Sequence, residues 1–140
     1  MSRTIRGAFA AWTLAATAGG ALAADDCGAA LKAAQPWIAE ADGIRVAFGA
    51  RPLPVPVGRH FDIHFAVCGV ALRGGATVAV DADMPAHRHG MNYRTRVEAV
   101  QPGVYRAHGL MFHMPGTWRV IFDLPLEGRT LRVTREIEVQ

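Results

Sequence analysis

The sequence predicts an all-β fold, an immunoglobulin-like antiparallel β-sandwich of about seven strands over residues 43–140. From residue 43 onward, apolar and polar residues alternate with period two, as in "HFDIHFAVC" and "TWRVIFDL". Turn signals such as "GG" and "QPG" separate the alternating runs. No helical pattern lies between the runs, which excludes a parallel α/β fold. Short strands joined by close turns are typical of a sandwich.

Each expected strand contributes one apolar face to the core. The strands are expected at 44–50, 60–68, 76–83, 93–100, 104–112, 117–124 and 129–140. Because side chains alternate across a strand, Phe61 and Phe65 should share one inner face, and Trp118 and Phe122 the other. The Ala-rich segment 24–42 is expected to be a short helix or a loop.

The first 23 residues have the features of a cleaved signal peptide. Arg3 and Arg6 precede an apolar run from Gly7 to Leu22, and "ALA" at 21–23 fits the small-x-small cleavage pattern. The alternative is a membrane anchor, but the run is short for a span of ~20 residues. Cleavage near Ala23 would release an exported, periplasmic domain at 43–140 without a stable membrane span.

The charge balance of the chain argues against a nucleic-acid partner. The formal net charge of +3 falls to +1 when Arg3 and Arg6 are removed with the signal peptide. Lys32 is the only lysine, and the sequence has no basic stripe with interleaved aromatic residues.

The two cysteines, Cys27 and Cys68, have two interpretations. In an exported chain, an even pair indicates a disulfide. Alternatively, Cys68 is a copper thiolate, but such a site usually has His and Met a few residues after the cysteine. Here "GVALRGG" follows Cys68, so the disulfide is favoured.

The soft metal-ligand side chains are confined to one window of the sequence. All four methionines that follow the signal peptide, and four of the six histidines, lie within residues 84–114. They form a first His/Met segment, "MPAHRHGM" at 84–91, and a second, "HGLMFHMPG" at 108–116. Thioether and imidazole groups together favour copper, as Cu(I) or Cu(II). The candidate ligands are Met84, His87, His89, Met91, His113 and Met114.

Other interpretations of these residues stay open. Asp81 and Asp83 lie close to the first segment, so zinc is not excluded. Met84 and Met111 fit core positions at strand ends. The remaining histidines, His60, His64 and His108, fit a solvated strand face. If the first segment is extended, His87, His89 and Met91 point to one side.

The motifs resemble those of the YtkA-like and FixH-like exported domains. The resemblance rests on "MPAHRHGMNY" and on "GVYRAHGLMFHMPGTWRVIFDL", and it covers roughly residues 43–139. It implies a small β-sandwich of the bacterial cell envelope. It also implies copper binding or delivery, often connected with cytochrome oxidase assembly or copper resistance.

Three classes of function follow from these patterns. The first is a periplasmic copper carrier or buffer that passes copper to a membrane or periplasmic acceptor. The alternative is a non-metal interaction module that assists assembly of a membrane protein complex such as cytochrome oxidase, since flexible methionines suit adaptable surfaces. An enzyme is not expected, because no nucleophile-base or paired-carboxylate arrangement stands out from the spacing.

Overall fold

The protein is an antiparallel β-sandwich, as predicted. The computed structural model describes residues 26–32 and 35–140, so the expected signal peptide lies outside the described residues. After a single 3-10 turn, η1 (Ala29–Leu31), come β1 (Trp37–Ala41), β2 (Ile44–Arg51), β3 (His60–Cys68), β4 (Ala79–Met84), β5 (His89–Gly90), β6 (Arg96–Gln101), β7 (Val104–Met111), β8 (Gly116–Leu126) and β9 (Arg129–Val139).

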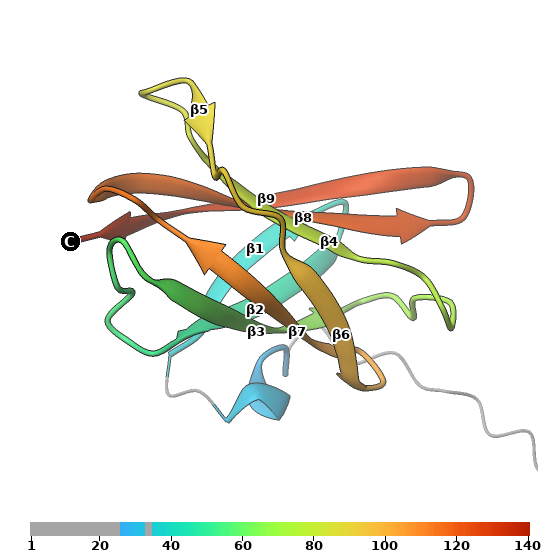
Figure 1. The fold of residues 1–140 in the computed structure, drawn as a ribbon. Coiled ribbons are helices and arrows are strands. Elements are labelled where there is room, and N and C mark those ends of the chain that lie inside the picture. The colour runs from blue at the N-terminus through green and yellow to red at the C-terminus, as the bar shows by residue number, and fades with distance from the viewer. Residues whose placement is uncertain (1–25, 33–34) are drawn as a thin grey trace, which may run out of the picture.

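The strands form two sheets that stack face to face (Figure 1). One sheet has the order β1-β2-β3-β7-β6, and the other has the order β5-β4-β8-β9. All neighbouring strands are antiparallel. The short β5 projects beyond the two layers on the side where the chain passes from β7 to β8.

The described chain has nine strands rather than about seven, and the sandwich begins before residue 43. The additional strands are β1 and the two-residue β5. β1 lies in the segment that was expected to be a helix or a loop. It forms because Asp42 and Gly43 both adopt positive φ, at 52° and 74°, and join Ala41 to Ile44 as a tight hairpin. Asp-Gly is a strong signal for such a turn, and it outweighs the helical preference of the preceding alanines.

The aromatic residues expected in the core are buried. Trp118, Phe65 and Phe122 have no exposed surface, and Phe61 is 3% exposed. Phe122 of β8 reaches across the sandwich to Phe65 of β3, with ring centroids 5.1 Å apart. The alternation in the sequence therefore assigned the inner faces correctly.

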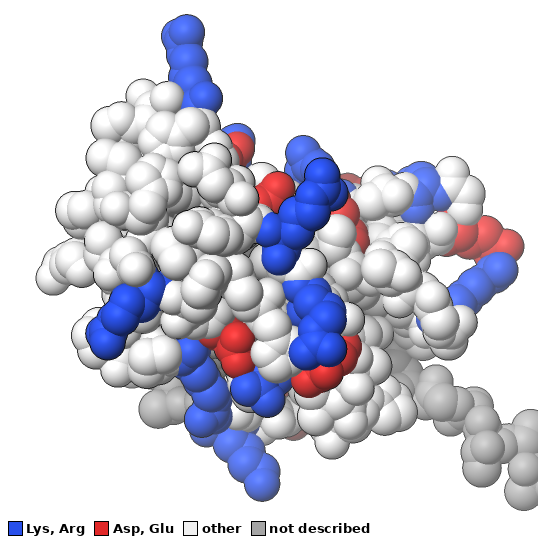
Figure 2. Space-filling view, viewed as in Figure 1, with Lys and Arg blue, Asp and Glu red and all other residues white. Residues whose placement is uncertain are grey.

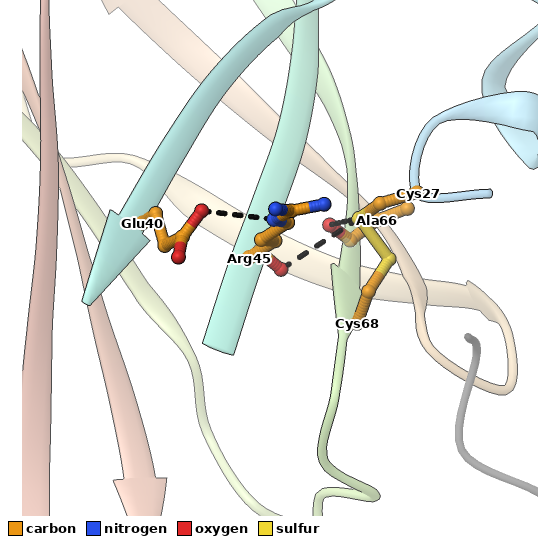
Figure 3. Close-up of a disulfide and its surroundings, with 5 residues drawn as sticks. All are labelled: Cys27, Glu40, Arg45, Ala66 and Cys68. Atoms are coloured by element: carbon orange, nitrogen blue, oxygen red, sulfur yellow. Dashed lines mark hydrogen bonds and ion pairs between the residues drawn. A yellow bond between two sulfur atoms is a disulfide. The ribbon is translucent and has the colours of Figure 1, made fainter. Parts of the chain in front are cut away.

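Cys27 and Cys68 form the predicted disulfide. It connects the N-terminal segment to the end of β3, on the outer face of the five-stranded sheet (Figure 3). The sulfur of Cys27 lies 3.7 Å from the carbonyl oxygen of Arg45 and 3.8 Å from that of Ala66. A second, smaller apolar cluster surrounds it, formed by Leu31, Ala47, Ala66, Cys68 and Val104. Cys68 is thereby occupied as a disulfide partner.

Replacing both cysteines, as Cys27→Ala with Cys68→Ala, should lower the free energy of unfolding by about 2–5 kcal/mol, since the bridge closes a loop with a sequence separation of 41. Urea denaturation of the oxidised protein and of the double variant measures the difference. The oxidised protein treated with a reductant is the control and should resemble the double variant. Two free thiols in the exported protein, found by mass analysis without reductant, would contradict the pairing.

Candidate metal site

The first His/Met segment is a tight turn between β4 and β5. Met84 pairs with His89 across the hairpin. The carbonyl oxygen of Met84 accepts hydrogen bonds from the backbone N–H groups of His87 and Arg88, at 3.0 and 2.9 Å. Arg88 has a φ of 56°. The segment is therefore not extended, so the condition under which His87, His89 and Met91 would point to one side of a strand is not met.

The second His/Met segment connects β7 to β8 and is held by the core. Trp118 donates a hydrogen bond from its indole Nε1–H to the carbonyl oxygen of Met114, at 3.0 Å. The Trp118 ring stacks on Phe112, with centroids 4.4 Å apart and an interplanar angle of 10°. Two fully buried aromatic rings thus fix the backbone on both sides of His113.

The two segments meet at one end of the sandwich, as their sequence positions suggested. The ring centroids of His89 and His113 lie 4.9 Å apart, and those of His87 and His89 lie 5.7 Å apart. Trp118 lies against both members of the closer pair, at 5.4 Å from His113 and 6.0 Å from His89. Three imidazoles from two separate loops therefore form one cluster, which we call the histidine cluster (His87, His89 and His113).

The methionines of the two His/Met segments lie at different depths. Met84 is 2% exposed and belongs to the main core. A Cβ atom added to Gly116 would lie 2.9 Å from the Met84 methyl group, so Met84 packs directly beneath the second segment. Met91 and Met114 are partly buried and rest against the same core. Met111 is only half-buried and lies outside both core clusters.

One ring nitrogen of the histidine cluster lacks a partner. His89 Nδ1 is buried and has no hydrogen-bond partner among the described residues. A buried polar atom of this kind costs about 1–3 kcal/mol of stability when it stays unpaired. An imidazole nitrogen is also a good ligand for copper, and the neighbouring thioethers favour a soft ion. The donor set at this end of the fold therefore fits copper.

The cluster does not form a site from imidazoles and carboxylates alone. In the described ranges, no three or more His, Cys, Asp or Glu side chains are grouped so that they could hold a metal ion. The carboxylate of Asp83 is engaged by Arg119, at 2.9 and 2.6 Å, and Asp81 accepts a hydrogen bond from the Ala82 N–H. A bound ion would have to use a thioether in addition to the histidines, which favours copper over zinc.

Charged residues near the cluster include Arg88 in the β4–β5 turn and the ion pair of Asp83 with Arg119. In Figure 2, the region around the β5 end is mostly uncharged on the visible face, with basic side chains at its margins. The visible face around β5 therefore presents few carboxylates that would compete for a cation.

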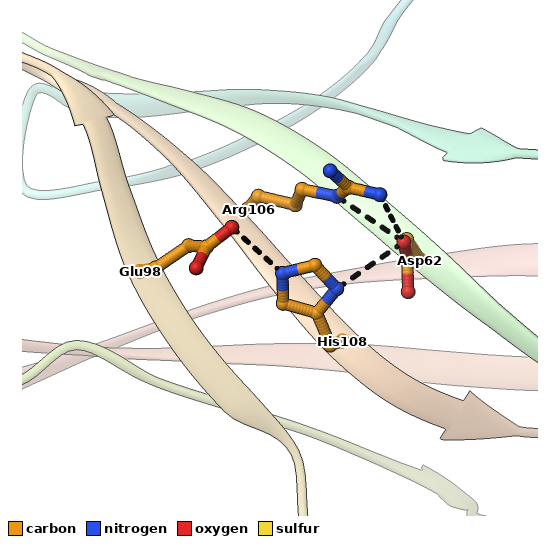
Figure 4. A network of polar contacts seen from close by, with 4 residues as sticks. All are labelled: Asp62, Glu98, Arg106 and His108. Carbon is orange, nitrogen blue, oxygen red and sulfur yellow. Dashed lines mark hydrogen bonds and ion pairs between the residues drawn. The ribbon is translucent and has the colours of Figure 1, made fainter.

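The sequence did not reveal a polar network on the outer face of the five-stranded sheet. His108 was expected on a solvated face, but it bridges Asp62 of β3, at 3.3 Å, and Glu98 of β6, at 2.9 Å (Figure 4). Arg106 donates to the same Asp62 oxygen from two of its nitrogens, at 3.2 and 2.8 Å. These partners lie far apart in the sequence, so period-two alternation alone could not pair them.

The network changes the acidity of its carboxyl groups. Burial tends to raise the pKa of Asp62, but the hydrogen bond from Arg106 and the charges of His108 and Arg106 outweigh it, so that this pKa is lowered. The hydrogen bond from His108 is the main cause that lowers the pKa of Glu98.

Replacing Asp62 should destabilise the fold in a pH-dependent way. A lowered pKa in the folded state means that the ionised carboxylate stabilises the fold above about pH 4, and that this contribution disappears as the pH falls through the lowered pKa. Asp62→Asn should therefore cost about 0.5–1 kcal/mol near neutral pH, a size limited by partial solvent exposure, and less in acid. Denaturation across pH measures this, with Glu127→Gln, from a highly exposed ion pair, as the control. A gap that stays constant down to acid pH would contradict the assignment.

The fold and the cluster define a class of protein, a small antiparallel β-sandwich with His and Met side chains gathered at one end. Within that class, residues 59–123 match the model of the YtkA-like family. The match contains both His/Met segments, and it confirms the YtkA-like resemblance predicted from the motifs. No curated protein and no solved structure matches the chain. None of the helices in the described residues has the length and apolar character that crossing a membrane requires.

Proposed function

We propose that this protein is a periplasmic copper-binding protein that carries or buffers copper and does not catalyse a reaction. The observation that supports this most strongly is the approach of His89 and His113, 4.9 Å apart, with a buried and unpartnered nitrogen on His89. The resemblance to YtkA-like domains points in the same direction.

The proposed ligands divide by depth and by chemistry. His89 and His113 form the centre of the site, and His87 approaches from the β4–β5 turn. Met91 and Met114 offer thioethers from the two segments, and small rotamer changes of such unbranched side chains can adjust their sulfur positions. Met84 lies deepest, so its sulfur would be the innermost ligand. Bound copper as Cu(II) would favour the imidazoles, and Cu(I) accepts imidazole and thioether together.

The placement of the ligands suits a carrier better than a permanent site. His87, Met91, His113 and Met114 lie on connections at the edge of the sandwich, while Met84 ends β4 and His89 begins β5. Partly exposed ligands on turns can exchange an ion with another protein. The uncharged surroundings would allow a membrane or periplasmic acceptor to approach closely.

A second candidate function uses the same end of the molecule without a metal. Partly buried methionines beside an uncharged surface also suit contact with another protein. In this case the domain would assist assembly of a membrane protein complex, such as cytochrome oxidase, by binding a protein partner at the His/Met end.

Cu(II) titration followed by tryptophan fluorescence tests the proposal. In a Trp37→Phe background, the signal of the signal-peptide-free protein comes from Trp118, whose ring lies 5.4 Å from that of His113. Cu(II) bound at the cluster should quench this signal. The double variant His89→Ala with His113→Ala should weaken Cu(II) binding by at least about tenfold, because two of the imidazole nitrogens that Cu(II) prefers are lost.

Competition for Cu(I) with a chromogenic chelator provides the complementary measurement. Met91→Leu with Met114→Leu should weaken Cu(I) binding by about tenfold or more and change Cu(II) binding less. His64→Gln is the matched histidine control, since His64 lies on the outer face of the other sheet, and it should leave both affinities unchanged. Unchanged copper affinity in both double variants would contradict the copper site and favour the interaction module.

A further inference from the structure

A pocket lies on the outer face of the five-stranded sheet. It has a volume of about 560 Å³, and its described lining includes Leu31, Trp37, Arg51, Leu53 and His64. Its walls are mainly apolar, with a guanidinium and an imidazole among them. Its volume is in the range of pockets that hold small organic ligands.

His64 brings an unsatisfied polar atom to this pocket. Its Nε2 is buried and has no hydrogen-bond partner within the part of the chain that the structure describes. The residue opposite His64 on β2 is Gly49, which also lines the pocket, so no side chain from that position covers the imidazole. Most buried polar atoms in folded proteins have a partner, which makes this nitrogen a candidate ligand contact.

The electrostatic surroundings keep His64 neutral. Burial is the main cause that lowers its pKa, and the positive charges of Arg106 and Arg51 lower it further. Asp62 opposes this shift, while His108 adds to it. A neutral imidazole with a proton on Nε2 can donate a hydrogen bond to an anion, and it carries no positive charge that the neighbouring arginines would repel.

Arg51 contributes a positive charge to the lining of this pocket. It forms no ion pair with any described residue. Asp62 lies opposite Arg51 across the β2–β3 pair, but its carboxylate is already bound by Arg106 and His108. An exposed guanidinium that has no ion pair among the described residues, in the lining of a mainly apolar pocket, is well suited to bind a carboxylate from a ligand.

We propose that this pocket binds a small organic carboxylate that carries an apolar or aromatic group. The carboxylate would lie between the Arg51 guanidinium and the Nε2–H of His64, and the apolar group would lie against Trp37, Leu31 and Leu53. The site shares no residue with the histidine cluster or with its thioethers. It is therefore independent of the proposed copper function.

Titration of isotope-labelled protein with phenylacetate and with octanoate, followed by NMR, tests the proposal. At least one of the acids should cause saturable shifts of the Trp37 indole and of residues around His64. Phenylacetamide, which keeps the ring but lacks the charge, should bind at least about tenfold more weakly than phenylacetate. The His64 imidazole signal should also show a raised pKa in the bound state, because a nearby anion favours the charged form.

Two arginine variants separate a specific site from general attraction of anions. Arg51→Gln should weaken binding of the acid by at least about tenfold. Arg135→Gln, which removes an exposed arginine from β9 in the other sheet, should have no effect. Equal loss in both variants would overturn the proposal, as would equal binding of the amide. It would also be overturned if neither acid caused saturable shifts at millimolar concentration, or if the shifts mapped to the His/Met end.

Discussion

The contact between Trp118 and the backbone of the second His/Met segment holds the candidate site in place. Trp118 is buried in the core, stacks on Phe112 and donates its one side-chain N–H to the Met114 carbonyl oxygen. One side chain thus connects the centre of the sandwich to the β7–β8 connection. Together with the buried ring of Phe112, this contact fixes the backbone on both sides of His113, whose ring lies 4.9 Å from that of His89.

The remainder of the fold positions the first His/Met segment and leaves part of the outer face of the five-stranded sheet uncovered. β4 and β8 pair in register, so the turn that follows Met84 is held beside the start of β8. The disulfide and η1 cover part of the outer face of the five-stranded sheet. Beside this covered area, Arg51 and His64 remain open to a ligand. The two proposed binding regions therefore lie on different parts of one rigid framework and rely on different residues.

The sequence predicted the features that depend on local pattern, and it missed those that depend on long-range pairing. Alternation identified the inner faces of β3 and β8, and cysteine parity identified the disulfide. The Ala-rich segment 24–42 was expected to be a short helix or a loop, and the hairpin at Asp42 and Gly43 was not predicted. The bridge from His108 to Asp62 and Glu98 joins three strands, so no short motif could indicate it.

In the candidate site, too, the features that depend on local pattern were predicted and those that depend on packing were not. Grouping of His and Met in two segments predicted that they would converge, and His89 and His113 do so. An extended segment would align His87, His89 and Met91 on one side, but the positive φ of Arg88 turns the chain there. The burial of Met84 fits the core position that the sequence allowed for it. The unpartnered nitrogen of His89 depends on how the β4–β5 turn packs against Trp118, which a single sequence does not encode as a pattern.

X-ray absorption spectroscopy of the Cu(I)-loaded protein, free of its signal peptide, tests the central claim most directly, because it identifies the atoms bound to the metal. The account predicts that thioether sulfur and imidazole nitrogen occur together in the shell of one bound copper ion. A shell of nitrogen and oxygen without sulfur, or a protein that retains no copper after desalting, would contradict it.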